Sequence, residues 1–94
     1  MTAYMIAEMD VTDPGAYDAY KAAAAAVIER YGGRYVARGG RVAALEGAGP
    51  KRIVVVEFDN IEAAQRWYHS EDYQRARQLR VDAAVGRLYV VEAL

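Results

Sequence analysis

The hydrophobic residues of this chain recur with a period of two in some segments and with a helical period in others. In residues 53–58 (IVVVEF), every side chain except that of Glu57 is β-branched or aromatic, which favours a pleated strand. Successive side chains of a strand point to opposite faces, so Ile53, Val55 and Glu57 share one face. The other face is entirely apolar, and we therefore expect both faces to be covered in the folded protein.

Residues 4–11 (YMIAEMDV) predict a first strand with the same alternation, in which Glu8 shares a face with Tyr4 and Ile6. The segment also resembles residues 53–59, since YMIAEMD and IVVVEFD place an acidic residue at matching positions. Each copy leads into a predicted helix. The chain therefore contains a weak internal repeat of a strand followed by a helix.

The first helix is predicted to begin at Asp13-Pro14. Thr12 or Asp13 can cap its first turn, and proline fits there because its missing N–H is not needed. Gly32-Gly33 ends the helix, since glycine accepts the left-handed backbone conformation found at helix ends. Six residues form its apolar stripe: Tyr17, Tyr20, Ala24, Val27, Ile28 and Tyr31.

A second strand is predicted over residues 34–38, and Gly39-Gly40 breaks it or forms a β-bulge. Residues 42–46 are expected to continue extended. The glycine- and proline-containing segment 47–50 then forms a turn that leads into the strand at 53–58.

After that strand, Asp59 or Asn60 can cap another helix, and Ser70 can cap a further helical segment. The helical spacing of Tyr73, Ala76, Leu79 and Ala83 extends this segment until Gly86 ends it. Residues 88–92 (LYVVE) are predicted to form the last strand.

The predicted order is strand, helix, strand, strand, helix, strand. This order is typical of an α+β, ferredoxin-like βαββαβ fold with an antiparallel sheet, formed here by a single domain over residues 1–94. Helices can cover only one face of such a sheet, yet both faces are apolar. A homodimer that packs sheet against sheet, as a dimeric α/β barrel, is the simplest way to cover the second face.

Composition narrows the possible functions. The net charge of −1 argues against a general binder of nucleic acid or of anionic membranes. The chain has no cysteine, hence no thiol nucleophile and no cysteine-ligated metal. It has no predicted signal peptide and no apolar run long enough to span a membrane, so the expected location is the cytoplasm.

Several short motifs together resemble a known family. They are V-T-D-P-x-x-Y at 11–17, Y-G-G-R at 31–34, R-G-G at 38–40, E-G at 46–47, V-V-x-E-F at 54–58 and W-Y-x-S-x-x-Y at 67–73. The chain is identified through them as a member of the family named domain of unknown function 1330, in the dimeric α/β-barrel superfamily. The resemblance implies a ferredoxin-like protomer whose sheet pairs with that of a partner. It implies no reaction.

Glu57 is the candidate catalytic residue, because a carboxylate on an apolar strand is costly unless it is paired or its pKa rises. It could act as a general base or hold a polar group of a ligand. The alternative is a structural ion pair with Arg38, Arg52 or Arg80. Glu8 on the first strand poses the same question.

Five residues are predicted to bind a ligand. Tyr68, Ser70 and Tyr73 lie at a junction between helices, where their hydroxyl groups could line the entrance of a pocket. Alternatively, Ser70 is a helix cap and the tyrosines belong to the core. Arg38, followed by two glycines, could hold an anion, and Glu57 completes the set.

No metal site is predicted. His69 is the single histidine and has no second ligand at metal-binding spacing, so it is interpreted as a surface residue. A haem-binding function rests on the superfamily alone.

The sequence therefore predicts a small homodimeric protein that binds or transforms a small acidic or aromatic molecule, without a cofactor, in a pocket between helices and sheet. Whether it is an enzyme stays open. The alternative is a non-catalytic dimerisation or stress-associated module.

Overall fold

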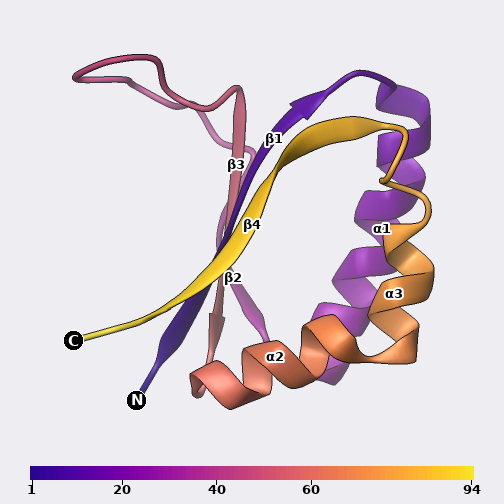
Figure 1. The fold of residues 1–94 in the computed structure, drawn as a ribbon, viewed down its shortest axis with the longest axis vertical. Coiled ribbons are helices and arrows are strands. Elements are labelled where there is room, and N and C mark those ends of the chain that lie inside the picture. The colour runs from indigo at the N-terminus through magenta and orange to yellow at the C-terminus, as the bar shows by residue number, and fades with distance from the viewer.

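The computed structural model describes all 94 residues and contains one four-stranded antiparallel sheet with three helices on one of its faces (Figure 1). The elements are β1 (Ala3–Val11), α1 (Pro14–Arg30), β2 (Arg34–Arg38), β3 (Arg52–Phe58), α2 (Ile61–His69), α3 (Glu71–Arg77) and β4 (Ala84–Glu92). The strand order is β2-β3-β1-β4, with β1 and β3 in the centre. The predicted α+β, ferredoxin-like fold is confirmed.

The side chains of β1 and β3 alternate between the two faces as predicted. Met5, Val54 and Val56 are buried under the helices, whereas Ile6 and Val55 point away from them. We call this second side the open face, because no element of the chain covers it (Figure 1). Cross-strand pairing places these residues on it: Tyr4, Ile6, Glu8, Ile53, Val55, Glu57, Arg87, Tyr89 and Val91.

The helix caps follow from short polar side chains. Asp13 accepts from the N–H of Ala16, and Asn60 accepts from the N–H of Ala63 at 2.7 Å. The Ser70 hydroxyl accepts from the N–H of Tyr73 at 3.1 Å. Each bond satisfies an N–H that the first helical turn leaves free. Ser70 thus ends α2 and starts α3, which turns the chain sharply at this junction.

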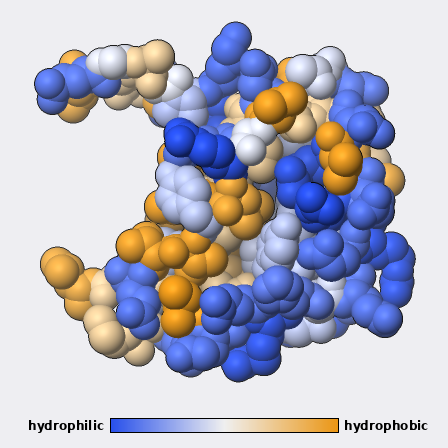
Figure 2. Space-filling view, in the orientation of Figure 1, coloured by the Kyte–Doolittle hydropathy of each residue, from blue (hydrophilic) through white to orange (hydrophobic).

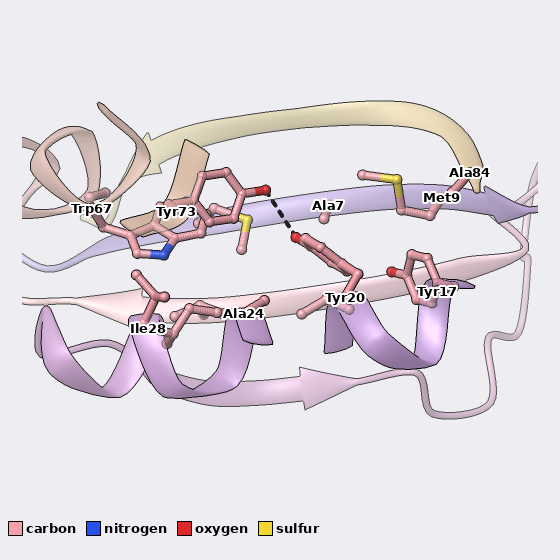
Figure 3. Packing of buried hydrophobic residues seen from close by; sticks show 14 of the residues in the cluster. Ala7, Met9, Tyr17, Tyr20, Ala24, Ile28, Trp67, Tyr73 and Ala84 are labelled. Atoms are coloured by element: carbon pink, nitrogen blue, oxygen red, sulfur yellow. Dashed lines mark hydrogen bonds between the residues drawn. The ribbon is translucent and has the colours of Figure 1, made fainter. Parts of the chain in front are cut away.

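The core is built on aromatic side chains between the helices and the sheet (Figure 3). Trp67 is completely buried, with its ring 5.6 Å from that of Phe58 and 4.3 Å from that of Tyr73. The stripe predicted for α1 is buried against the same cluster, apart from the half-buried Tyr31.

No helix of the structure combines the length and the apolar character needed to cross a membrane.

The prediction that the last helix extends to Gly86 is wrong. α3 ends at Arg77, a series of turns follows, and β4 begins at Ala84 instead of residue 88. The carbonyl of Ala83 accepts from the N–H groups of Thr12 and Asp13, which ties this segment to the end of β1. Tertiary pairing therefore overrides the helical spacing of the side chains.

The connection between β2 and β3 is an arm, residues 39–51, that projects from the sheet on its open-face side (Figure 1). Residues 42–46, which were expected to continue extended, form no strand. β2 ends at Arg38, as expected if Gly39-Gly40 breaks the strand, whereas the bulge alternative is wrong because the irregularity in the β2–β3 pairing lies between Tyr35 and Ala37. Leu45 in the arm is 94% exposed.

Gly86 provides a test of the packing of β4 on β1. A Cβ atom at this position would lie 1.9 Å from the carbonyl oxygen of Glu8. Gly86→Ala should therefore force the two strands apart and destabilise the fold by about 2–3 kcal/mol. For a domain of this size, the melting temperature should fall by roughly 10–20 °C. In the control Gly40→Ala, where no atom lies within 4 Å of the added Cβ, it should change by only a few degrees. Equal melting temperatures for the two variants would contradict the register of β4.

Candidate functional site

The candidate site is a small pocket between α1 and the helix-covered face of the sheet, which we call the α1 pocket. It lies where β2 ends and β3 begins, beside the first turns of α1. Nine of its twelve lining residues are hydrophobic, and its free volume is about 20 Å³. That volume holds about one water molecule, so a larger ligand requires the half-buried or exposed side chains at the rim to move outward. The other three lining residues are the basic residues Lys21, Arg38 and Arg52, and three of the nine hydrophobic ones, Tyr17, Tyr20 and Tyr35, carry a hydroxyl group.

Two guanidinium groups form the charged part of the α1 pocket. Arg52 stacks over the ring of Tyr17, with 5.4 Å from its Cζ to the ring centroid, and its buried Nε has no hydrogen-bond partner. Arg38 lies 4.5 Å above the ring of Tyr35 and reaches the carbonyl of Lys21 at 3.5 Å. Tyrosine faces attract these cations but satisfy none of their N–H groups.

A third guanidinium lies behind the pocket. The hydroxyl groups of Tyr20 and Tyr73 are 2.9 Å apart (Figure 3). Arg80 donates to the Tyr73 hydroxyl at 3.4 Å. The guanidinium of Arg80 also lies over the ring of Tyr20, at 5.5 Å. Burial raises the pKa of Tyr20, and the adjacent Tyr73 raises it further. Tyr20 is therefore a neutral phenol at physiological pH.

None of these three arginines forms an ion pair with a carboxylate. The salt bridges of the chain use other basic residues, one of which is Lys21 at the pocket, paired with Asp18 at 3.1 Å. Arg38 is exposed, but Arg52 and Arg80 are partly buried, and a partly desolvated guanidinium without an anionic partner is energetically unfavourable. The α1 pocket can therefore accept an anion, and a carboxylate matches the fork geometry of arginine.

The prediction that Glu57 lies in a pocket between helices and sheet is wrong. The alternation of β3 places Glu57 on the open face, and it binds Arg34 at 3.0 Å instead of Arg38, Arg52 or Arg80. The Glu57 side chain is 30% exposed and that of Arg34 is 57% exposed. This pair is a solvent-accessible ion pair in the isolated chain.

The other predicted ligand-binding residues do not meet at one site. Arg38 lines the α1 pocket, and Tyr73 supports it through Tyr20. Tyr68 instead lines a separate depression between α2 and β4, together with His69. The Ser70 hydroxyl donates to the carbonyl of Trp67 at 2.7 Å while it caps α3, so both of its bonds are local. Ligand binding by Tyr68 and Ser70 stays a prediction, and the two residues do not line a common pocket.

Sequence reasoning missed Arg52 and the pocket-lining role of Tyr17 and Tyr20. The two tyrosines were correctly assigned to the buried stripe of α1, but a buried stripe does not reveal where its packing leaves a gap. The signal for Arg52 was present, since it shares a strand face with Val54 and Val56 and is the one charge on that face of β3.

A second polar cluster lies on the open face. Tyr89 donates to Glu8, and Arg87 binds the same carboxylate at 3.0 Å. The hydrogen bond from Tyr89 lowers the pKa of Glu8, and the one from Arg87 lowers it further. The carboxylate is therefore ionised at neutral pH.

No group of three metal-ligating side chains occurs in the structure, and His69 is exposed at the end of α2.

Comparison with known proteins gives a family and a fold. The model of the family described as a domain of unknown function (DUF1330) matches residues 2–94. No curated protein matches the chain significantly. A protein of unknown function from Rhodopseudomonas palustris is 24% identical with a TM-score of 0.77, over 99% of this chain and 82% of that one.

Two more distant structures share the fold. SnoaB from Streptomyces nogalater, a cofactor-independent oxygenase, is 14% identical with a TM-score of 0.69, over 99% of this chain and 93% of its own. A dimeric ferredoxin-like protein of unknown function from Bacteroides fragilis is 12% identical with a TM-score of 0.67, over 98% and 96% of the two chains.

The partly exposed Glu57–Arg34 pair predicts a mild effect of mutation. Exposed ion pairs contribute about 0–1 kcal/mol, so Glu57→Gln should lower the melting temperature by no more than roughly 8 °C. The isosteric substitution keeps the shape of the side chain and removes its charge. Thermal unfolding followed by circular dichroism measures the effect. A loss well beyond 10 °C would mean that Glu57 is buried in solution.

Proposed function

Because this chain belongs to a family described as a domain of unknown function (DUF1330), we propose a function from its own residues. We propose that it is a homodimeric protein that binds a small organic acid in the α1 pocket, without a cofactor. The observation that carries the proposal is the presence of Arg38 and Arg52 at a mainly apolar pocket whose lining includes no carboxylate of the chain.

The two halves of the pocket suit the two halves of such a ligand. Arg52 has a buried Nε without a partner, and a carboxylate of the ligand would accept from it and from the terminal N–H groups. The apolar residues on β1, β3 and α1 would contact the hydrocarbon part. A few polar groups converging on an apolar cleft are typical of small-molecule sites.

Cofactor-free chemistry on the bound acid is an extension of this proposal. The fold is shared with SnoaB, a cofactor-independent oxygenase, but at 14% identity that likeness concerns the fold. The α1 pocket contains no carboxylate, histidine or thiol that could act as a base or nucleophile. Binding is therefore the function that the geometry supports, and catalysis would have to come from the ligand itself or from the tyrosines.

The homodimer is supported by the open face. Hydrophobic side chains gather in the recess between the arm and the C-terminal end of the chain (Figure 2). Val85, Tyr89 and Val91 on β4 are each more than 40% exposed. An exposed apolar patch bordered by charged side chains is typical of an interaction site. Structural relatives from Bacteroides fragilis and Jannaschia are described as dimeric. We place the dimer in the cytoplasm.

The alternative is a non-catalytic dimerisation module. The open face would serve such a module equally well, because it lies on the opposite side of the sheet from the α1 pocket. Ligand binding and dimerisation therefore need separate tests.

The binding test uses small carboxylates, each paired with its primary amide. The carboxylates should raise the melting temperature and the amides should not, because the guanidinium groups require an anion. Arg52→Met should weaken the binding of benzoate by roughly 10- to 100-fold, the value of a charged hydrogen bond. Isothermal titration calorimetry measures this change.

The matched control for that test is Arg66→Met, since Arg66 is exposed on α2 and outside the pocket. It should leave benzoate affinity unchanged. Equal responses to acids and amides, or equal losses in the two variants, would refute an anion site at Arg52.

The assembly test places a charge in the centre of the open face. Val55→Asp would bury an unpaired carboxylate in a sheet-to-sheet interface and should give monomers or aggregates in sedimentation velocity at micromolar concentration. Ala22→Asp, on an exposed position of α1, should sediment as a dimer like the parent chain. A monomeric parent chain would contradict the proposed dimer.

A further inference from the structure

The hydroxyl pair of Tyr20 and Tyr73 has a definite direction, which can be derived by counting donors and acceptors. Each phenol carries one proton, and the two oxygens are 2.9 Å apart, so one hydroxyl donates to the other. The proton of the accepting hydroxyl must then find a different acceptor. Where that acceptor can lie differs for the two residues.

Around Tyr73, the other polar neighbour is a donor. Arg80 has only N–H groups to offer, and it donates to the Tyr73 oxygen at 3.4 Å. If Tyr20 donated to Tyr73, the proton of Tyr73 would have no acceptor, since its oxygen is bonded to no group besides Tyr20 and Arg80. Tyr73 is completely buried, so water cannot supply one either.

Around Tyr20, the remaining space is the α1 pocket. Tyr20 lines this pocket and Tyr73 does not. If Tyr73 donates to Tyr20, the proton of Tyr20 is free to point into the pocket, where a water or a ligand atom can accept it. This direction leaves the Tyr20 proton at a pocket that an acceptor can enter, whereas the opposite direction leaves the proton of the completely buried Tyr73 without an acceptor.

We propose that the bonds run from Arg80 to Tyr73, from Tyr73 to Tyr20 and from Tyr20 into the α1 pocket, so that Tyr20 selects organic acids that carry a second hydrogen-bond acceptor, such as a carbonyl oxygen. This inference rests on the proposed function, because it assigns Tyr20 as the contact of one end of a ligand whose other end, the carboxylate, binds Arg38 and Arg52.

Tyr17 and Tyr20 place the two ends of the ligand site on neighbouring turns of α1. Arg52 lies over Tyr17, and Tyr20 follows one helical turn later. A ligand that contacts both Arg52 and Tyr20 therefore has its carboxylate and its acceptor on opposite sides of one small ring or short chain. Oxo acids and acyl-substituted aromatic acids have this arrangement.

Tyr20 also remains a donor at every pH at which the protein would be studied. Its burial raises its pKa, and the neighbouring Tyr73 acts in the same direction. The chain of donors begins at Arg80, which cannot act as an acceptor, so the direction is not reversed by pH.

The experiment compares two probes of similar shape, 4-acetylbenzoate and 4-isopropylbenzoate, by isothermal titration calorimetry. Both have the carboxylate, and only the first has a carbonyl acceptor. The parent protein should bind 4-acetylbenzoate roughly fivefold more tightly, which corresponds to one net hydrogen bond. Tyr20→Phe should abolish this preference and keep the affinity for 4-isopropylbenzoate. Tyr31→Phe, at the tyrosine that follows α1 and lies outside the pocket, should retain it.

Tyr73→Phe distinguishes the two directions of the pair. In the proposed direction the preference is present in the parent protein and persists in Tyr73→Phe, because Tyr20 keeps its proton for the ligand. In the opposite direction the preference is absent from the parent protein and arises only in Tyr73→Phe, which would overturn the proposal. Melting curves identify any variant that fails to fold.

Neutron diffraction of the unliganded protein gives a test that needs no ligand. The deuteron of Tyr73 should point at the Tyr20 oxygen, and that of Tyr20 should point into the pocket. The reverse assignment overturns the inference whatever the probes do. Binding of both probes that survives Arg52→Met would instead refute the proposed anion site, so the two failures can be told apart.

Discussion

The alternation of side chains along the two central strands is the constraint on which the rest of the structure depends. β1 and β3 are apolar on both faces, but all three helices pack on one of them (Figure 1). Each position of these strands is thereby assigned either to the core or to the open face. A shift of one residue in register would exchange the two sets, so the assignment is strongly determined. The positions of the charged groups follow from it directly.

This alternation keeps the carboxylates of Glu8 and Glu57 away from the α1 pocket. Glu8 and Glu57 both fall on the open face, where Arg87 and Arg34 neutralise them. The helix-covered side receives Arg52 and Arg38, and α3 leads to Arg80 behind them, with tyrosine rings and no carboxylate as neighbours. A chain with a net charge of −1 thus contains a locally cationic pocket. Overall charge and composition could not have revealed this, because they do not distinguish the two faces.

The sequence predicted what depends on local pattern. The strand faces, the cap at Ser70 and the buried stripe of α1 all follow from spacing or from single side chains. The end of α3 was missed because pairing of β4 with β1 extends to Ala84 and overrides the helical spacing. The site was predicted less well for a related reason: Glu57 was judged by its apolar neighbours along the strand, whereas the face it occupies decides its environment. Arg38 was found, but its pairing with Tyr35, and the gap beside Tyr17 and Tyr20, arise only from packing.

The arm and the α1 pocket are joined through the same residues. Arg38 ends β2 and Arg52 begins β3, so the arm, residues 39–51, leaves and re-enters the sheet between the two guanidinium groups of the pocket. Antiparallel neighbours can be connected by a far shorter loop, so the connection alone does not require this length. At its base, the N–H of Gly39 donates to the carbonyl of Ile53, and its φ of 69° is one that glycine tolerates. A Cβ there would lie 2.1 Å from Nη1 of Arg52. The absence of a side chain at Gly39 is therefore what lets Arg52 lie against Tyr17, and any change at the base of the arm acts directly on the cationic end of the pocket.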